Sequence, residues 1–91
     1  MKDQEQLKSL NQLLALVVGG RIAKQTEHLK NAPLNRVSHA EEIIADGELQ
    51  YATLDLRDGR EDATRKISQV QRKLDSLKSL KVLAEMVEEN V

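Results

Sequence analysis

The sequence predicts an all-α protein, a long helical hairpin or three-helix bundle with coiled-coil-like packing that associates into oligomers. Apolar residues between Ile67 and Val87 recur three and four residues apart, the spacing of a helix that buries one face against another helix. The 91 residues contain no Phe, no Trp and one Tyr, so the core must be aliphatic. A chain this short buries only about 60–65% of its unfolded surface, which favours self-association.

The first helix is predicted to span residues 3–30. Asp3 and Gln6 have the spacing of an N-terminal capping box. Gly19 and Gly20 offer an earlier end, because each glycine costs about 1 kcal/mol inside a helix. Apolar residues resume after them, so we expect the helix to continue until Pro33 stops it. Its apolar stripe consists of Leu7, Leu10, Leu14 and Val17.

Two further capping boxes predict where the other helices begin. Ser38 and Glu41 lie three residues apart and start a helix around residues 39–57. Asp58 and Glu61 repeat this spacing and start a helix over residues 59–90, which can merge with the second. The three helices form one domain, residues 1–91, and the predicted core is made by Leu7, Leu10, Leu14, Val17, Ile43, Leu56, Ile67, Val70, Leu74 and Leu77.

The stretch over residues 43–56 has two interpretations. Apolar residues from Leu49 to Leu77 keep a period of about 3.5, which predicts a helix. Residues 49–54 also resemble a strand between the turn dipeptides Asp46-Gly47 and Asp58-Gly59, which would give a β-hairpin between two long helices. The longer pattern favours the helix, and the hairpin remains the alternative.

Charged residues fall into blocks of opposite sign. Residues 41–62 carry a net charge of −6, residues 63–82 carry +5, and the tail after them carries −3. A parallel, in-register dimer would set like charges side by side. An antiparallel or staggered arrangement of helices from two protomers would set the acidic block against a basic one.

Small residues recur every fourth position at Ala15, Gly19 and Ala23. On one continuous helix they would share a face and let two helices approach closely. The alternative is a flexible joint at Gly19-Gly20 with unrelated alanines beside it.

Two sets of residues are candidates for binding. The first is the apolar seam, predicted to contact a second copy of the chain (a homodimer or higher oligomer) or another protein: Leu7, Leu10, Leu14, Val17, Ile67, Val70, Leu74 and Leu77. The second is a group of basic residues on predicted helix faces that could bind a nucleotide or nucleic acid: Arg21, Lys24, Arg36, Arg65, Lys66, Arg72 and Lys73. The alternative interpretation of this second set is a solvent-exposed face whose positive charge balances that of the acidic block.

Composition narrows the functional classes further. The chain has no cysteine and no recognisable arrangement of nucleophile, base and orienting group, so we expect no enzyme, metal site or cofactor. The longest apolar run, Leu13–Val18, is too short to cross a bilayer, and we expect a cytoplasmic protein. The favoured function is a small oligomeric adaptor or regulator that acts by protein–protein contacts. The alternative is a regulator that binds an anionic ligand through a basic helix face.

Overall fold

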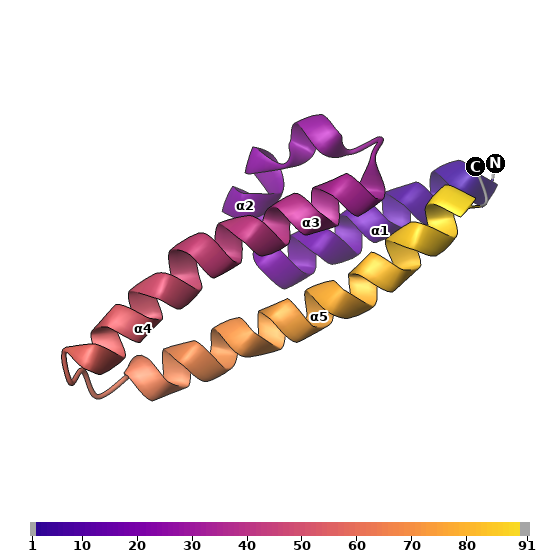
Figure 1. Cartoon of the computed structure of the whole chain (residues 1–91). Coiled ribbons are helices and arrows are strands. Elements are labelled where there is room, and N and C mark those ends of the chain that lie inside the picture. Colours follow the sequence, from indigo (N-terminus) through magenta and orange to yellow (C-terminus); the bar gives the residue numbers. More distant parts are fainter. Residues whose placement is uncertain (1, 90–91) are drawn as a thin grey trace.

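A computed structural model describes residues 2–89, which form helices and turns with no strand among them (Figure 1). The predicted all-α class is confirmed. Within these residues, no helix has both the length and the apolar character that a bilayer crossing requires. The elements are α1 (Lys2–Val18), α2 (Gly20–Gln25), the 3-10 helix η1 (Glu27–Leu29), α3 (Pro33–Ile44), the π-helical turn η2 (Ala45–Leu49), α4 (Gln50–Arg57) and α5 (Ala63–Glu89).

The molecule is a rod of 51 × 21 × 16 Å in which α5 runs antiparallel to the continuous helix made by α3, η2 and α4 (Figure 1). In one half of the rod, α1 packs on both α3 and α5, and α2 with η1 folds back to lead into α3. In the other half, α4 contacts only η2 and α5 among the described elements. This second half is a two-helix arm, and the arm comprises α4 and the first turns of α5.

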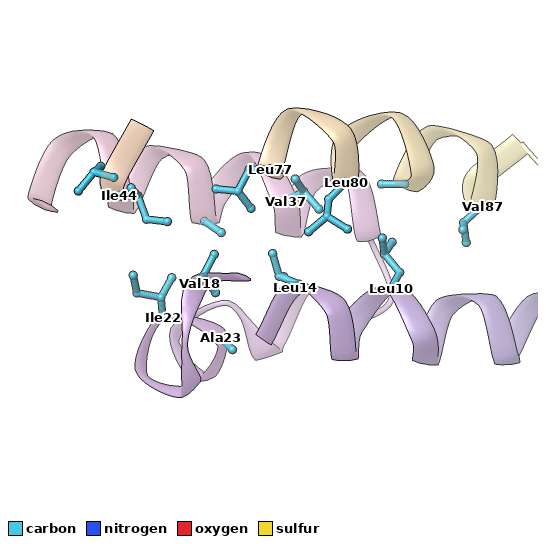
Figure 2. Close-up of a cluster of buried hydrophobic side chains, with 13 residues drawn as sticks. Leu10, Leu14, Val18, Ile22, Ala23, Val37, Ile44, Leu77, Leu80 and Val87 are labelled. Carbon is cyan, nitrogen blue, oxygen red and sulfur yellow. The ribbon is translucent and has the colours of Figure 1, made fainter. Parts of the chain in front are cut away.

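Aliphatic side chains from α1, α2, α3 and α5 form the core, as Figure 2 shows. Leu14, Ile44 and Leu77 are completely buried at its centre. Leu56, which the sequence placed in the core, is half exposed, because it lies on the two-helix arm where α5 alone covers α4. The core cluster consists of Leu10, Leu14, Val18, Ile22, Ala23, Val37, Ala40, Ile44, Val70, Leu77, Leu80, Ala84 and Val87.

The prediction of one helix over residues 3–30 is wrong, because Gly19 breaks it. Gly19 has φ 87° and ψ 162°, a conformation that is essentially restricted to glycine. The chain turns there, so Ala15 on α1 and Ala23 on α2 do not share a helix face, and the predicted face of small residues does not form. The bend lets Val18, Ile22 and Ala23 all reach the core. The proposed cap by Asp3 concerns a side chain outside the described residues.

The second helix begins at Pro33 and not near residue 39. Proline is favoured in the first turn of a helix, since its missing N–H would have no partner there, so Pro33 starts a helix as well as ending the preceding turn. Ser38 therefore lies inside α3 and does not cap it. The cap comes from α5, where the Glu88 carboxylate accepts a hydrogen bond of 3.1 Å from the Leu34 backbone N–H.

Residues 43–56 are helical, so the β-hairpin alternative is excluded. The helix contains the π turn η2, whose effect is visible in the spacing of buried residues. Ile44 and Ala52 are both buried but lie eight residues apart, a separation that leaves them about 80° out of phase on a regular α-helix. A π turn takes up one additional residue and brings both side chains to the face that meets α5.

The turn between α4 and α5 is built on Gly59, which the favoured interpretation of the sequence placed at the start of the last helix. Gly59 has φ 76° and ends α4, with the Gly59 N–H donating to the Leu56 carbonyl and the Arg60 N–H donating to the Asp55 carbonyl. This pair of bonds is a Schellman motif. The last helix therefore begins at Ala63 and not at residue 59, and its predicted end at residue 90 falls outside the described residues.

The two adjacent glycines give a matched test of the bend. Gly19→Ala should destabilise the protein by about 1–3 kcal/mol, since alanine is strained at this φ and ψ. Gly20→Ala should be neutral or slightly stabilising, because Gly20 is in α2 and a Cβ there meets nothing within 4 Å. Urea unfolding of both variants measures the difference, and equal stabilities would contradict the bend.

Candidate functional site

The residues predicted as an oligomer interface lie mostly inside the chain's own core. Leu10, Leu14, Val70 and Leu77 are buried there. Leu7, Val17 and Leu74 are partly buried and pack against it, and Ile67 is half-buried on α5. The buried members of the apolar seam therefore join helices of one chain, and the role of the seam in a contact with another chain stays a prediction.

A different set of large apolar side chains remains in water. Along one side of the rod, α1 and α5 form a groove of about 450 Å³, here called the α1–α5 groove. Leu10 and Val87 of the core form its floor, and Leu13, Leu83 and Met86 line it while remaining 43–52% exposed. Leu16 on α1 and Val82 on α5 are also exposed, at 82% and 57%.

A second groove of about 570 Å³ lies where α1 ends and the two-helix arm continues, and it is here called the arm groove. Apolar side chains of the core border it, together with Gly47 of the π turn and the exposed Tyr51 of α4. Its charged lining residues are Arg21, Glu48, Asp55, Lys66 and Lys73.

Three ion pairs connect α5 to the continuous helix opposite it, and we call them the ladder. The acidic members recur every seven residues and come from α3, η2 and α4. The bonds join Glu41 to Lys81 at 3.1 Å, Glu48 to Lys73 at 3.1 Å, and Asp55 to Lys66 at 3.3 Å. The acidic block thus meets the basic block within one chain. The charge pairing that the sequence suggested between two protomers therefore forms inside a single protomer.

The ladder also decides the role of two predicted anion-binding residues. Lys66 and Lys73 hold carboxylates of the neighbouring helix, and a ligand would have to compete with these carboxylates. Lys66 also bonds Asp62 at 3.3 Å, one helical turn before it. The hydrogen bond from Lys66 keeps the pKa of Asp62 below its ordinary value, and the bonds to Asp55 and Asp62 raise the pKa of Lys66.

Arg36 has a structural place in the fold. Its side chain is buried, donating one hydrogen bond of 3.1 Å to Thr26 Oγ1 and another of 2.9 Å to the Ala23 carbonyl. These bonds tie α3 to the end of α2. Burial lowers the pKa of the Arg36 guanidinium, and the nearby Glu27 carboxylate opposes that shift.

The remaining predicted cations are exposed but are spread over the molecule. Arg21 borders the arm groove, and Lys24 lies in a shallow depression beside Glu27 and the buried Arg36. Arg65 and Arg72 are exposed on α5. The seven basic residues therefore do not form one continuous cationic face.

Histidine gives no metal site in the part of the chain that is described. His28 and His39 approach each other edge to face, with ring centroids 6.0 Å apart. Among residues 2–89, no group of three or more histidine, aspartate or glutamate side chains is placed to hold a metal ion. The histidines therefore make a local contact between η1 and α3.

No family model, curated protein or solved structure matches this chain. Sequence reasoning identified the aliphatic helices but missed the side chains that stay exposed. For the α5 side of the α1–α5 groove, the signal was the pair Leu83 and Met86, which lie three residues apart beside the buried Val87.

Arg36→Met should lower the free energy of unfolding by about 1–2 kcal/mol, because it removes two buried hydrogen bonds and leaves Thr26 without its donor. Lys24→Met is the matched control, and this exposed change should alter stability by less than about 0.5 kcal/mol. Urea denaturation compares the two. If Arg36→Met is as stable as the control, the guanidinium does not hold α2 to α3.

Lys66→Gln should lower the thermal midpoint at about pH 7 and have little effect at about pH 2. The depressed pKa of Asp62 stabilises the fold above the ordinary carboxylate range, and this contribution is lost as the pH falls through the folded-state pKa. The raised pKa of Lys66 also stabilises the fold, but its pH dependence is the opposite. This contribution is lost as the pH rises above the ordinary lysine range.

Lys78→Gln, an exposed change on the same helix, is the control for general charge effects. A difference between Lys66→Gln and the wild type that is the same at both pH values would count against the ion pairs at Lys66.

Proposed function

We propose that the chain is a small oligomeric interaction protein, an adaptor or regulator of the cytoplasm that acts by contacts between helices. The observation that carries this proposal is the α1–α5 groove, where exposed leucine and methionine side chains continue the core outward. Contiguous apolar surface of this kind is typical of an interaction site, whereas single exposed apolar residues are ordinary.

The energetics favour covering this surface. Each Å² of apolar area that leaves water contributes about 25 cal/mol. Leu13, Leu83 and Met86 line one groove and are each about half exposed, so a packed helix would remove apolar area from all three together. Methionine is unbranched and adapts its shape to the side chains that contact it.

The seven-residue recurrence of the ladder acids supports coiled-coil-like packing. In coiled coils, charged residues flank the apolar seam and select the partner and its direction. Within the chain, Glu41, Glu48 and Asp55 pair in this way with lysine side chains of α5. We propose that association of two chains uses the same kind of contact, with helices antiparallel or staggered.

The arm groove favours the alternative function, binding of an anionic ligand. It brings together three of the seven candidate cations, Arg21, Lys66 and Lys73, beside the Gly19-Gly20 bend. Glu48 and Asp55 line the same groove and neutralise the two lysines. Protein–protein contact is therefore the better-supported function.

At micromolar concentration, light scattering should give a mass above that of one 10.2 kDa chain. A monomer at all accessible concentrations would overturn the proposal. Added nucleotides should leave the thermal stability of the protein unchanged. Added protein should leave the gel mobility of nucleic acid unchanged. Salt-sensitive stabilisation or retardation would instead support the anionic-ligand alternative.

A further inference from the structure

We propose that a depression beside α2 binds the carboxylate groups of an acidic protein segment, through an unused edge of the buried Arg36 guanidinium. The inference rests on the proposed function for the source of the carboxylates, a partner protein, and assigns a contact surface separate from the α1–α5 groove. The depression, here called the Arg36 depression, has a volume of about 310 Å³. It is lined by Asn11 of α1, Ala23 and Lys24 of α2, Glu27 of η1, Lys30 and Arg36 of α3.

The first argument is the edge of the Arg36 guanidinium that the fold leaves unused. Nε donates to Thr26 Oγ1 at 3.1 Å and Nη2 donates to the Ala23 carbonyl at 2.9 Å, so both bonds lie on one edge of the planar group. Nη1 has no hydrogen-bond partner among residues 2–89. Every fully buried side-chain nitrogen or oxygen that the structure describes has a partner, so Nη1 must reach solvent. Arg36 is only 6% exposed and lines the depression, which is therefore where Nη1 meets solvent.

The chemistry of this edge matches a carboxylate. Nη1 and Nη2 each carry an N–H that points away from the Nε side, and the two oxygens of one carboxylate accept both. The packed fold already holds the guanidinium in place, so a ligand does not have to order a long flexible side chain. Burial lowers the pKa of Arg36, which means that its positive charge has lost solvation that a bound carboxylate replaces in part.

Two further cations lie at the rim of the Arg36 depression. Lys24 and Lys30 are exposed, and within the described part of the chain neither of them forms an ion pair. Asn11 Nδ2 donates a hydrogen bond of 3.3 Å to the Lys30 carbonyl, which ties this turn to α1. One carboxylate on Arg36 thus leaves the lysines for neighbouring carboxylates, so an acidic segment fits better than a single acidic residue.

Glu27 favours a carboxylate over a phosphate at this site. Its carboxylate lies close enough to oppose the pKa shift of Arg36, but the two side chains form no ion pair. A doubly charged phosphate would be repelled by Glu27 more strongly than a singly charged carboxylate. None of the described residues that line the depression is aromatic, so a nucleobase would have no ring to stack on.

Titration of the full ¹⁵N-labelled chain with a blocked oligoglutamate peptide tests the site by NMR. The Arg36 Nε–H signal should shift and saturate, because the peptide binds the same guanidinium. The Nε–H signal of Arg72, which is exposed on α5, is the internal control and should stay in place. An oligoglutamine peptide should move neither signal. If oligoglutamate moves both arginine signals equally, or neither of them, the site is overturned.

Charge variants test the rim and the role of Glu27 at about physiological salt, where distant charges are screened. Lys24→Gln should raise the dissociation constant of oligoglutamate at least about twofold, and Glu27→Gln should lower it by a similar factor. Lys78→Gln removes the same charge as Lys24→Gln from an exposed position on α5 and should leave the constant unchanged. Equal effects of the two lysine variants would show diffuse attraction and contradict the site.

The outcomes separate this inference from the proposed function. A monomeric chain whose Arg36 signal responds to oligoglutamate overturns the oligomeric part of the proposed function and supports the site. An oligomer whose Arg36 signal ignores the peptide overturns the site while oligomerisation stands. Inorganic phosphate that moves the Arg36 signal where oligoglutamate does not would overturn the carboxylate as the ligand.

Discussion

The antiparallel contact between α5 and the continuous helix of α3, η2 and α4 holds the rest of the molecule in place. α5 is the element that touches α1 at one end of the rod and α4 at the other. Leu77 is completely buried in this contact, and the ladder fixes its register from Glu41 to Asp55. Surface ion pairs contribute little energy each, so the aliphatic side chains stabilise the contact and the ladder specifies its alignment.

Backbone adjustments let the remaining elements fit this contact. The bend at Gly19 ends α1 halfway along the rod and directs Ile22 of α2 into the core. The π turn keeps Ile44 and Ala52 on the same side over a helix that would otherwise rotate them apart. The early end of α1 leaves the two-helix arm uncovered and creates the arm groove.

The sequence was sufficient to predict the helical class and the residues of the α5 seam, because the spacing of Val70 and Leu77 directly reflects helical geometry. It misplaced several helix ends. Gly59 and Pro33 occur in patterns compatible with either a start or a stop, and the tertiary fold decides which one forms. The cap of α3 was beyond local reasoning, because Glu88 is 54 residues from Leu34.

The binding surface was harder to predict for a physical reason. Apolar periodicity and charge blocks have the same appearance whether two helices belong to one chain or to two. In this chain, Leu10 and Leu77 are buried internally, and the side chains left for a partner, such as Leu13 and Met86, are neighbours of the seam. Only the packed structure separates these two sets.

Zero-length carbodiimide cross-linking of a mixture of ¹⁵N-labelled and unlabelled chains tests most directly whether the ladder belongs to one chain. The account predicts that peptides joining Glu48 to Lys73, and Glu41 to Lys81, carry a single isotope, because both partners come from the same molecule. Peptides of mixed isotope at these positions would show that α5 packs against a different copy, and the intramolecular hairpin would be contradicted.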